Sequence, residues 1–273
     1  MTLGIDIGGT TISLGLVNGS EVVRKTTVPS FAADATQTET LEYLGDRIAE
    51  ILTPEVEKIG IGVPSLTDPK RGIVYDAANI PSWDVVPLKD KMEERFGIPV
   101  SVNNDANCYV LGAALHLPQD AHTVVAVTLG TGTGVGIVVN GRLFSGSHCG
   151  AGEVGALAYN NHDYETFCSK KFFTRQGLDP AQLSKAADKG DDSAKSIFRE
   201  FGEHLGEFLS VIMYAYDADH IVLGGGIANA FRHFSESMWE MLRSQYPYDT
   251  ALDDLEIHVM PNAELAMVGA ASL

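Results

Sequence analysis

The sequence predicts an α/β protein built from two related lobes, and two observations carry this prediction. First, short apolar runs alternate with segments whose apolar residues recur at helical spacing, which is typical of mostly parallel sheets covered by helices. Second, one strand–turn–strand pattern occurs twice, at residues 3–23 and 125–145. Two copies indicate a duplication, and we expect their glycine-rich turns to face one ligand cleft.

The repeat can be followed in the printed sequence. LGIDIGGTTISLGLVNGSEVV begins at Leu3, and VAVTLGTGTGVGIVVNGRLFS begins at Val125, an offset of 122 residues. Each copy contains Asn-Gly before its last strand, at 18–19 and at 140–141. Asn-Gly between apolar runs favours a type I′ hairpin, because both central residues need positive φ. Each copy is therefore predicted to be strand, glycine-rich turn, strand, Asn-Gly turn, strand.

The remaining elements follow from periodicity and from turn residues. Helices are expected at residues 38–52, 87–96, 105–115, 193–216, 228–246 and 264–272. Strands are expected at residues 59–64, 99–103, 220–223 and 255–260. The boundary falls just before the second copy, which gives lobes of residues 1–117 and 118–262. The segment 263–273 is a candidate to complete the N-terminal lobe.

Composition and charge limit the classes of function that the protein can have. The 273 residues carry 19 Lys+Arg against 36 Asp+Glu, a net charge of −17, and 45% are apolar. This mixture is that of a folded globular protein. The negative charge repels phosphate backbones, so no nucleic-acid partner is expected. ATP is not excluded, because local amides and a metal ion hold a small anion whatever the net charge.

Cysteine usage and the N-terminal segment suggest a cytoplasmic protein. Three cysteines without a C-x-x-C pair predict no disulfide framework. The first residues show no secretory signal, and no segment approaches the length of a membrane span. A metal cluster of His148, Cys149, His162 and Cys168 is conceivable, but its spacing matches no standard zinc pattern.

Two glycine-rich turns are candidate phosphate sites. Adjacent glycines let backbone amides and threonine hydroxyls point at phosphate oxygens. Asp6, at the end of a strand, could hold Mg²⁺ through water. The alternative is a plain hairpin turn, and neither copy is a Walker or a Rossmann motif. The residues concerned are Gly8, Gly9, Thr10 and Thr11 in the first copy and Gly130, Thr131, Gly132 and Thr133 in the second.

Three further motifs could carry chemistry. Asp105, where a strand meets a helix, could cap that helix or take a proton from a bound hydroxyl. Glu153 lies among glycines whose G-x-G-x-x-G spacing is a chance match, because no strand leads into it and no helix follows. The run Gly224, Gly225, Gly226 and Ile227 could let the backbone approach a flat ring such as adenine.

Seven motifs together resemble the ROK family (repressors, open reading frames, kinases), whose kinases are sugar kinases of the actin-like ATPase superfamily. In order, they are DIGGTT (6–11), GVP (62–64), NIPSW (79–83), NNDAN (103–107), LGTGTGVG (129–136), GEVG (152–155) and LGGGI (223–227). The resemblance covers essentially the whole chain. It implies two ribonuclease-H-like lobes that close over Mg-ATP and a hexose, and it implies a homodimer.

The resemblance also assigns roles by position. Asp105 resembles the general base on the sugar hydroxyl. Asn79, Asn104, Glu153 and Glu165 resemble sugar contacts. The two glycine-rich turns resemble the phosphate turns, and Gly224 to Ile227 resemble the adenosine turn.

The chain departs from the family pattern in one region. Ala156 stands where the family usually has a histidine that touches sugar and binds zinc, and only residues 157–164 separate it from Glu165. The cysteine-rich zinc loop is missing, so no structural zinc site is expected. The expected function is a glucokinase-like kinase. N-acetylmannosamine, N-acetylglucosamine, allose or fructose kinases are alternatives, and a non-catalytic sugar or nucleotide sensor is an alternative of another class.

Overall fold

The computed structural model describes residues 1–77, 79–147 and 150–273, and the chain divides into two compact units. Unit 1 comprises Met1–Leu117, Leu143–Ala151 and Ala263–Leu273. Unit 2 comprises Pro118–Arg142 and Gly152–Asn262. The segment 143–151, expected in the C-terminal lobe, thus groups with unit 1.

Unit 1 is built on a five-stranded sheet in the order β3-β2-β1-β4-β8. The strands are β1 (Thr2–Ile7), β2 (Thr11–Asn18), β3 (Glu21–Pro29), β4 (Lys58–Val63) and β8 (Val100–Asn104). β1 pairs antiparallel with β2 and parallel with β4, which pairs parallel with β8. The carboxyl ends of β1, β4 and β8 therefore meet at one edge, which is where α/β sheets place their ligands.

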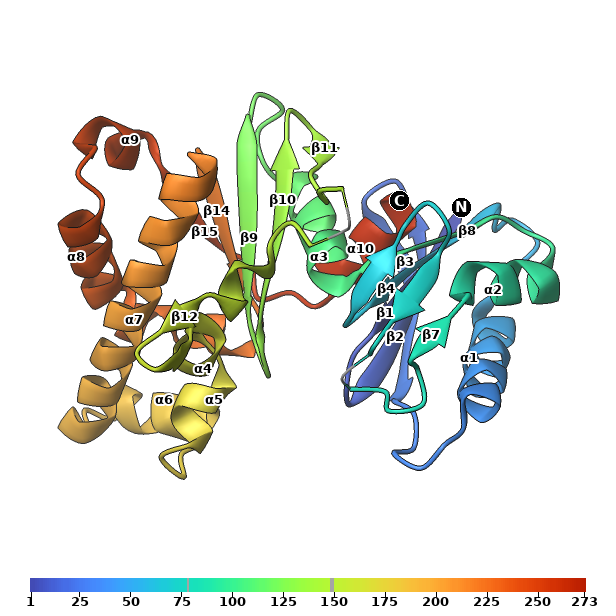
Figure 1. Ribbon diagram of the computed structural model, residues 1–273, viewed down its shortest axis with the longest axis horizontal. Helices are drawn as coiled ribbons and strands as arrows, with labels where there is room; N and C mark the ends of the chain where they lie inside the picture. The colour runs from blue at the N-terminus through green and yellow to red at the C-terminus, as the bar shows by residue number, and fades with distance from the viewer. Residues whose placement is uncertain (78, 148–149) are drawn as a thin grey trace. The chain divides into compact units, whose positions relative to one another are not determined.

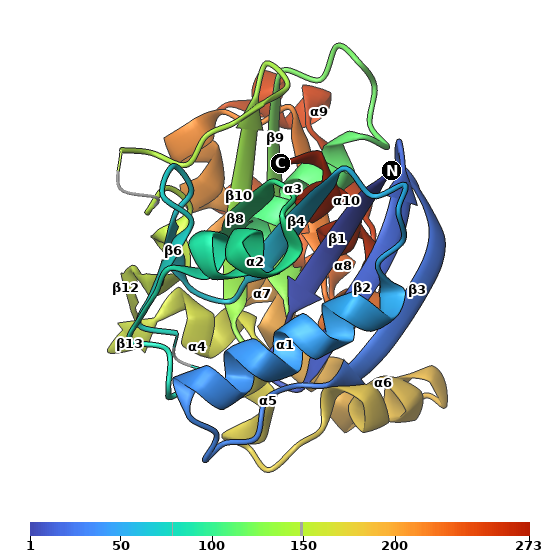
Figure 2. The same ribbon diagram turned by 90° about the vertical axis from the view of Figure 1, so that its right-hand side faces the viewer.

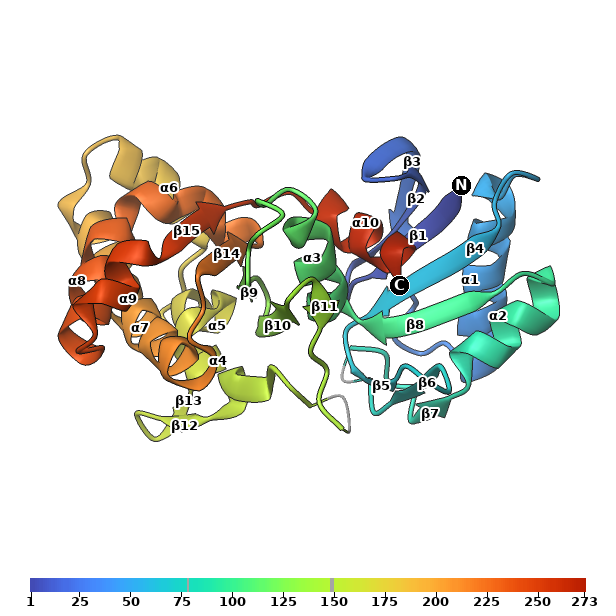
Figure 3. The same cartoon turned by 90° about the horizontal axis from the view of Figure 1, so that it is seen from above.

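Helices cover both faces of this sheet. Figure 2 shows α1 (Gln37–Ile51) and α2 (Leu88–Phe96) lying across one face. On the other face, α3 (Asp105–Ala114) packs against α10 (Glu264–Ser272), as Figure 3 shows. A capping box between Thr36 and Glu39 begins α1 and satisfies amides that a helix start leaves unpaired.

The packing of α10 depends on glycines in the elements beneath it. A Cβ at Gly60 of β4 would lie 1.7 Å from the carbonyl oxygen of Ala270, and one at Gly269 would lie 1.6 Å from that of Cys108. No side chain fits at such distances, so α10 lies directly on the backbone of β4 and α3. A small sheet beside β8 completes unit 1, with strands β5 (Leu66–Asp68), β6 (Ile73–Tyr75) and β7 (Val85–Val86).

Unit 2 repeats the same sheet order and directions, β11-β10-β9-β14-β15. The strands are β9 (Thr123–Leu129), β10 (Thr133–Val139), β11 (Arg142–Leu143), β14 (His220–Gly224) and β15 (Glu256–Val259). β9 pairs antiparallel with β10 and parallel with β14, which pairs parallel with β15. The predicted α/β fold with a duplicated strand pattern is confirmed.

The helices of unit 2 include a long pair, α7 (Asp192–Tyr216) and α8 (Ser235–Gln245), which pack side by side (Figure 1). The shorter elements are η1 (Glu153–Ala156), β12 (Ala158–Tyr159), β13 (His162–Asp163), α4 (Tyr164–Cys168), α5 (Lys170–Thr174), α6 (Pro180–Asp188), η2 (Gly226–His233) and α9 (Asp249–Asp254). Within the described ranges, no helix has both the length and the apolar character needed to cross a bilayer.

The structure corrects two local predictions. The expected continuous helix at 228–246 is wrong, because Phe234 separates the 3₁₀ helix η2 from α8 with non-helical dihedrals while its ring is fully buried. Asn140 and Gly141 both have positive φ, as a type I′ turn requires. In the first copy, a bulge shifts the register, so that Gly19 and Ser20 form the turn and only Gly19 has positive φ.

Candidate active site

Two carboxylates lie near each other at the sheet edge of unit 1. Asp6 is near the end of β1, and Asp105 is the first residue of α3. Burial, and then the charge of Asp105, raises the pKa of Asp6 from 3.8 to about 7. Burial also raises the pKa of the Cys108 thiol well above its usual range, and Asp6 and Asp105 add to this shift. The edge therefore concentrates negative charge that a cation would offset.

The start of α3 assigns different roles to two adjacent residues. The Asn104 side-chain oxygen caps the helix, accepting from Ala106 N at 2.9 Å and Asn107 N at 3.2 Å. The N-cap role considered for Asp105 is therefore wrong, because Asp105 lies one residue further on, in the first turn. The Asn104 amide nitrogen donates to Ser65 O at 3.3 Å, so both ends of this side chain serve the fold.

The first glycine-rich turn is closed by its own backbone. Gly8 N donates to Thr11 O at 2.8 Å, and Ser30 Oγ donates to Gly8 O at 2.8 Å. Gly9, Thr10 and Thr11 are exposed. A methyl group at Gly9 would lie 3.5 Å from the Asn79 side chain, so this predicted sugar contact lies against the first turn.

The second glycine-rich turn is held by the segment that contains α4 and α5. Thr133 N donates to Glu165 Oε2 at 3.1 Å, and the buried Thr133 hydroxyl donates to Cys168 O at 2.9 Å. Lys170 N donates to Gly130 O at 2.8 Å. Both polar donors of Thr133 therefore bond within the protein, and the Gly130 amide donates to Gly132 O at 3.0 Å, so the amides of Thr131 and Gly132 are better placed for a ligand.

The two predicted sugar-binding glutamates lie near each other in unit 2. Partial burial, and then the charge of Glu165, raises the pKa of Glu153. Glu165 itself is ion-paired with Lys171. Gly152, which precedes Glu153, has φ +96° and would place a Cβ 2.1 Å from Val135 O. The glycines of this motif therefore allow η1 to pack directly against the backbone of β10. In the described part of this segment, Glu153 to Ala156 form a 3₁₀ helix and not the start of a Rossmann helix.

A cavity of about 660 Å³ in unit 2 brings the second turn and the third glycine run together. Gly130 and Thr131 line one part, and Gly226 and Ile227 another. Gly224 and Gly225 shape the turn instead. Gly225 has φ +79°, and a Cβ there would lie 2.4 Å from Leu129 O.

Sequence reasoning missed the residues that α6 and η2 add to this cavity. They include Ser184, Lys185, Asp188, Asn229 and Arg232. The Arg232 guanidinium contacts both Asp188 carboxylate oxygens, at 2.7 and 2.6 Å. The sequence around α6 contains no motif, and helix periodicity alone does not show which face meets a ligand.

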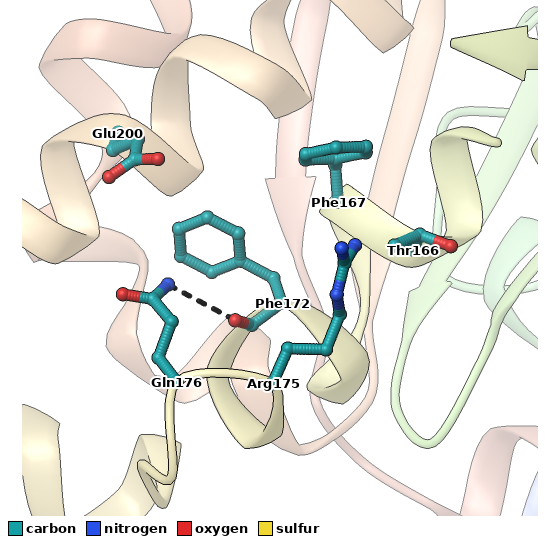
Figure 4. Close-up of a pocket in the computed structure, with 6 residues that line it drawn as sticks. All are labelled: Thr166, Phe167, Phe172, Arg175, Gln176 and Glu200. Carbon is teal, nitrogen blue, oxygen red and sulfur yellow. Dashed lines mark hydrogen bonds between the residues drawn. The ribbon is translucent and has the colours of Figure 1, made fainter. Parts of the chain in front are cut away.

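A second, smaller cavity of about 280 Å³ is open to the surface of unit 2 (Figure 4). Its walls are Thr166, Phe167, Phe172, Arg175, Gln176 and Glu200. None of these residues was predicted to bind a ligand. Gln176 Nε2 donates to Phe172 O at 3.1 Å, which fixes the polar side of the cavity to α5.

The conceivable cluster of His148, Cys149, His162 and Cys168 receives little support. His148 and Cys149 lie outside the described residues. Cys168 is fully buried, and burial raises its thiol pKa well above the usual range. A metal ligand must be deprotonated, so this environment disfavours Cys168 as a ligand.

Comparisons with known proteins identify the family of this chain. The model of the ROK family matches residues 2–273. A glucokinase of Thermotoga maritima is 28% identical, with 99% of this chain and 96% of that protein covered. An N-acetyl-D-glucosamine kinase of Vibrio parahaemolyticus is 31% identical, with 84% and 85% covered.

A solved structure extends the match to the fold. The ROK family glucokinase of Streptomyces griseus, in complex with glucose and AMPPNP, has a TM-score of 0.84 and 26% identity. The alignment covers 99% of this chain and 98% of that one. The actin-like ATPase fold expected from the sequence is confirmed, and the chain belongs to the ROK family.

Proposed function

We propose that this protein transfers the γ-phosphoryl group of ATP to the 6-hydroxyl of a hexose, with Asp105 as general base. The enzyme class, an ATP-dependent sugar kinase, rests on the family match and on the relatives named above. The finer proposal rests on one observation, the placement of Asp105 in the first turn of α3 beside Asp6.

The proposed step uses Asp105 as a proton acceptor. As the sugar oxygen attacks the γ-phosphorus, the O–H proton passes to the Asp105 carboxylate, the new O–P bond forms, and the bond to the β-phosphate oxygen breaks to release ADP. Catalysis of this kind depends mainly on positioning and on charge stabilisation.

The carboxylates of unit 1 fit a magnesium ion. Mg²⁺ prefers oxygen ligands and keeps several waters. The pKa of about 7 for Asp6 shows that this carboxylate is destabilised as an anion where no cation is present. We therefore assign Asp6 to Mg²⁺, through water, and the ion would neutralise phosphate charge during transfer.

The cavity in unit 2 is the proposed nucleotide site. The amides of Thr131 and Gly132 would donate to phosphate oxygens, and Gly226 and Ile227 would lie against the adenine ring. Lys170 and Lys185 supply positive charge at the cavity wall, whereas Arg232 is paired there with Asp188. This charge offsets part of the net negative charge of the chain near a nucleotide.

Glucose is the proposed first substrate. The relatives include glucokinases and N-acetyl-D-glucosamine kinases, so N-acetylhexosamines remain candidates beside allose and fructose. A pocket discriminates sugars through a few hydrogen bonds to hydroxyl groups. Ala156 removes one such group and leaves room for a larger substituent, and Glu153 and Glu165 remain as acceptors.

The test is a coupled ADP-release assay with Mg-ATP across hexoses and N-acetylhexosamines. Asp105→Asn keeps the size of the side chain and removes its basicity, so kcat should fall roughly 10²–10⁴-fold. Asp120→Asn, the same change at an exposed loop position, is the matched control and should retain wild-type rates.

Two results would overturn the proposal. A loss of less than about threefold in Asp105→Asn with every sugar would remove Asp105 as the base. Sugar-induced thermal stabilisation without ADP release, from a wild-type protein that binds ATP, would favour the sensor instead.

A further inference from the structure

The strand pair β14–β15 of unit 2 gathers two imidazoles and a carboxylate on one face. His220 is opposite Glu256 in the parallel register, and His258 follows two residues after Glu256. Side chains alternate along a strand, so Glu256 and His258 share a face. Their ligand atoms all lie within 4.8 Å of one another, and no other such group occurs among the described residues.

The spacing of these atoms matches the ligand shell of one metal ion. His220 Nδ1 lies 3.0 Å from His258 Nε2, and Glu256 Oε2 lies 4.0 Å from the first nitrogen and 3.5 Å from the second. The point equidistant from these three atoms is about 2.1 Å from each, which is the length of zinc–imidazole and zinc–carboxylate bonds, but it lies in the plane of the three atoms. A tetrahedral ion therefore requires the exposed Glu256 side chain to rotate, without movement of the strands.

A direct hydrogen bond between the imidazoles is the simpler explanation of their contact. At 3.0 Å, one ring nitrogen can donate to the other. That bond leaves the position of the carboxylate unexplained, because Glu256 Oε2 is no closer than 3.5 Å to either ring nitrogen. A shared ion accounts for all three groups.

We propose that His220, Glu256 and His258 form a zinc site, with water as the fourth ligand. Two imidazoles and one carboxylate suit Zn²⁺, whereas Mg²⁺ and Ca²⁺ favour oxygen donors throughout. The His220 side chain is 9% exposed and that of Glu256 is 62% exposed, so solvent reaches the site from the carboxylate side. The ion joins the edge strand β15 to β14, and its binding free energy stabilises unit 2.

The site is separate from the proposed nucleotide cavity of unit 2. His220 is the first residue of β14, whereas Gly224 at the other end leads to Gly226 in the nucleotide cavity. It also lies outside residues 156–165, where the family pattern places its zinc loop. Removal of zinc should therefore lower stability without abolishing catalysis.

The test uses untagged protein stripped with a chelator and then titrated with Zn²⁺ or Co²⁺. We expect one tightly bound ion per chain and a rise in Tm with added Zn²⁺, because a ligand of the folded state stabilises it. Bound Co²⁺ should show the visible absorption of a tetrahedral site without thiolate charge transfer, which excludes the cysteines as ligands.

Single substitutions distinguish a bound metal ion from a direct hydrogen bond between the two imidazoles. His258→Gln should weaken Zn²⁺ binding at least about tenfold, and Glu256→Gln should weaken it too. His116→Gln, the same change at an exposed histidine, should bind like the wild type. Tm in chelator checks that each variant folds. Absence of binding in the wild type, or equal binding in wild type and His258→Gln, would overturn the proposal.

Discussion

The two glycine-rich turns come from the same repeated pattern, yet their surroundings differ. The first turn, residues 8–11, is closed by Ser30 and by its own backbone, and Asp6 and Asp105 concentrate negative charge in the same unit. The second turn, residues 130–133, is tied to α4 and α5 through Glu165, Cys168 and Lys170.

The difference shows how a duplicated turn can take two roles. At the position of Asp6, the second copy has Thr128, whose hydroxyl bonds with the backbone of Gly134. The first turn therefore has the chemistry to hold a cation. The second has no carboxylate at the corresponding position and is held by hydrogen bonds to α4 and α5, which suits it to one wall of a nucleotide cavity.

The largest expected effect tests the cation role of the first turn. Asp6→Asn should lower kcat roughly 10²–10³-fold, as loss of a preorganised charge at a reaction centre does. Thr128→Val makes the corresponding change in the second copy and should cost less than about tenfold. Steady-state kinetics at saturating Mg-ATP measure both, and equal losses would contradict the asymmetry.

The next effect concerns the glycines that border the second turn. No atom lies within 4 Å of a Cβ at Gly226, so Gly226→Ala should fold and raise KM for ATP roughly tenfold by filling the cavity. Gly225→Ala meets Leu129 O and should instead lower Tm. Both are read from ATP kinetics and thermal melts, and a Gly226→Ala variant with unchanged KM would exclude this wall from the nucleotide site.

A smaller effect is expected when a hydrogen bond that holds the second turn is disturbed. A Cβ at Gly132 would lie 2.4 Å from Glu165 Oε2, so Gly132→Ala should displace this carboxylate from Thr133 N and cost about 1 kcal/mol of stability. Gly9→Ala in the first turn meets only an ordinary contact with Asn79 and should cost less. Urea unfolding compares the two, and the opposite ranking would contradict the contrast.

A separate expected effect is a pH dependence of stability that Asp6, beside the first turn, contributes. The pKa of Asp6 is raised, so its contribution to stability is fully present below the ordinary value of 3.8 and is lost as pH rises through about 7. Without Mg²⁺, wild type should therefore lose stability relative to Asp6→Asn between pH 5 and pH 8. Melts at both pH values check this, and Mg²⁺ should restore the loss at pH 8.

Sequence reasoning succeeded where a local motif determines a local shape. It predicted the paired sheets and the Asn140-Gly141 turn, and it singled out Gly130 and Gly226, which line one cavity. The assignments of catalytic, sugar-binding, nucleotide-binding and magnesium residues stay predictions.

Prediction from the sequence failed where contacts between residues far apart in the chain determine the local structure. Asn104 became the helix cap, Thr133 bonded to distant carbonyl and carboxylate groups, and α6 reached the cavity without any motif. Hydrogen-bond partners far along the chain leave no trace in residue spacing. For the same reason, the His220, Glu256 and His258 cluster was not anticipated, because it depends on strand register.

The close seating of α10 has a consequence for the order of folding. This helix packs directly on β4 and α3 of unit 1, yet in the chain it follows all of unit 2. During synthesis, the part of this sheet face that α10 covers therefore stays exposed until unit 2 has left the ribosome. Nascent chains arrested before residue 263 should bind chaperones through that face, and release should follow once α10 emerges.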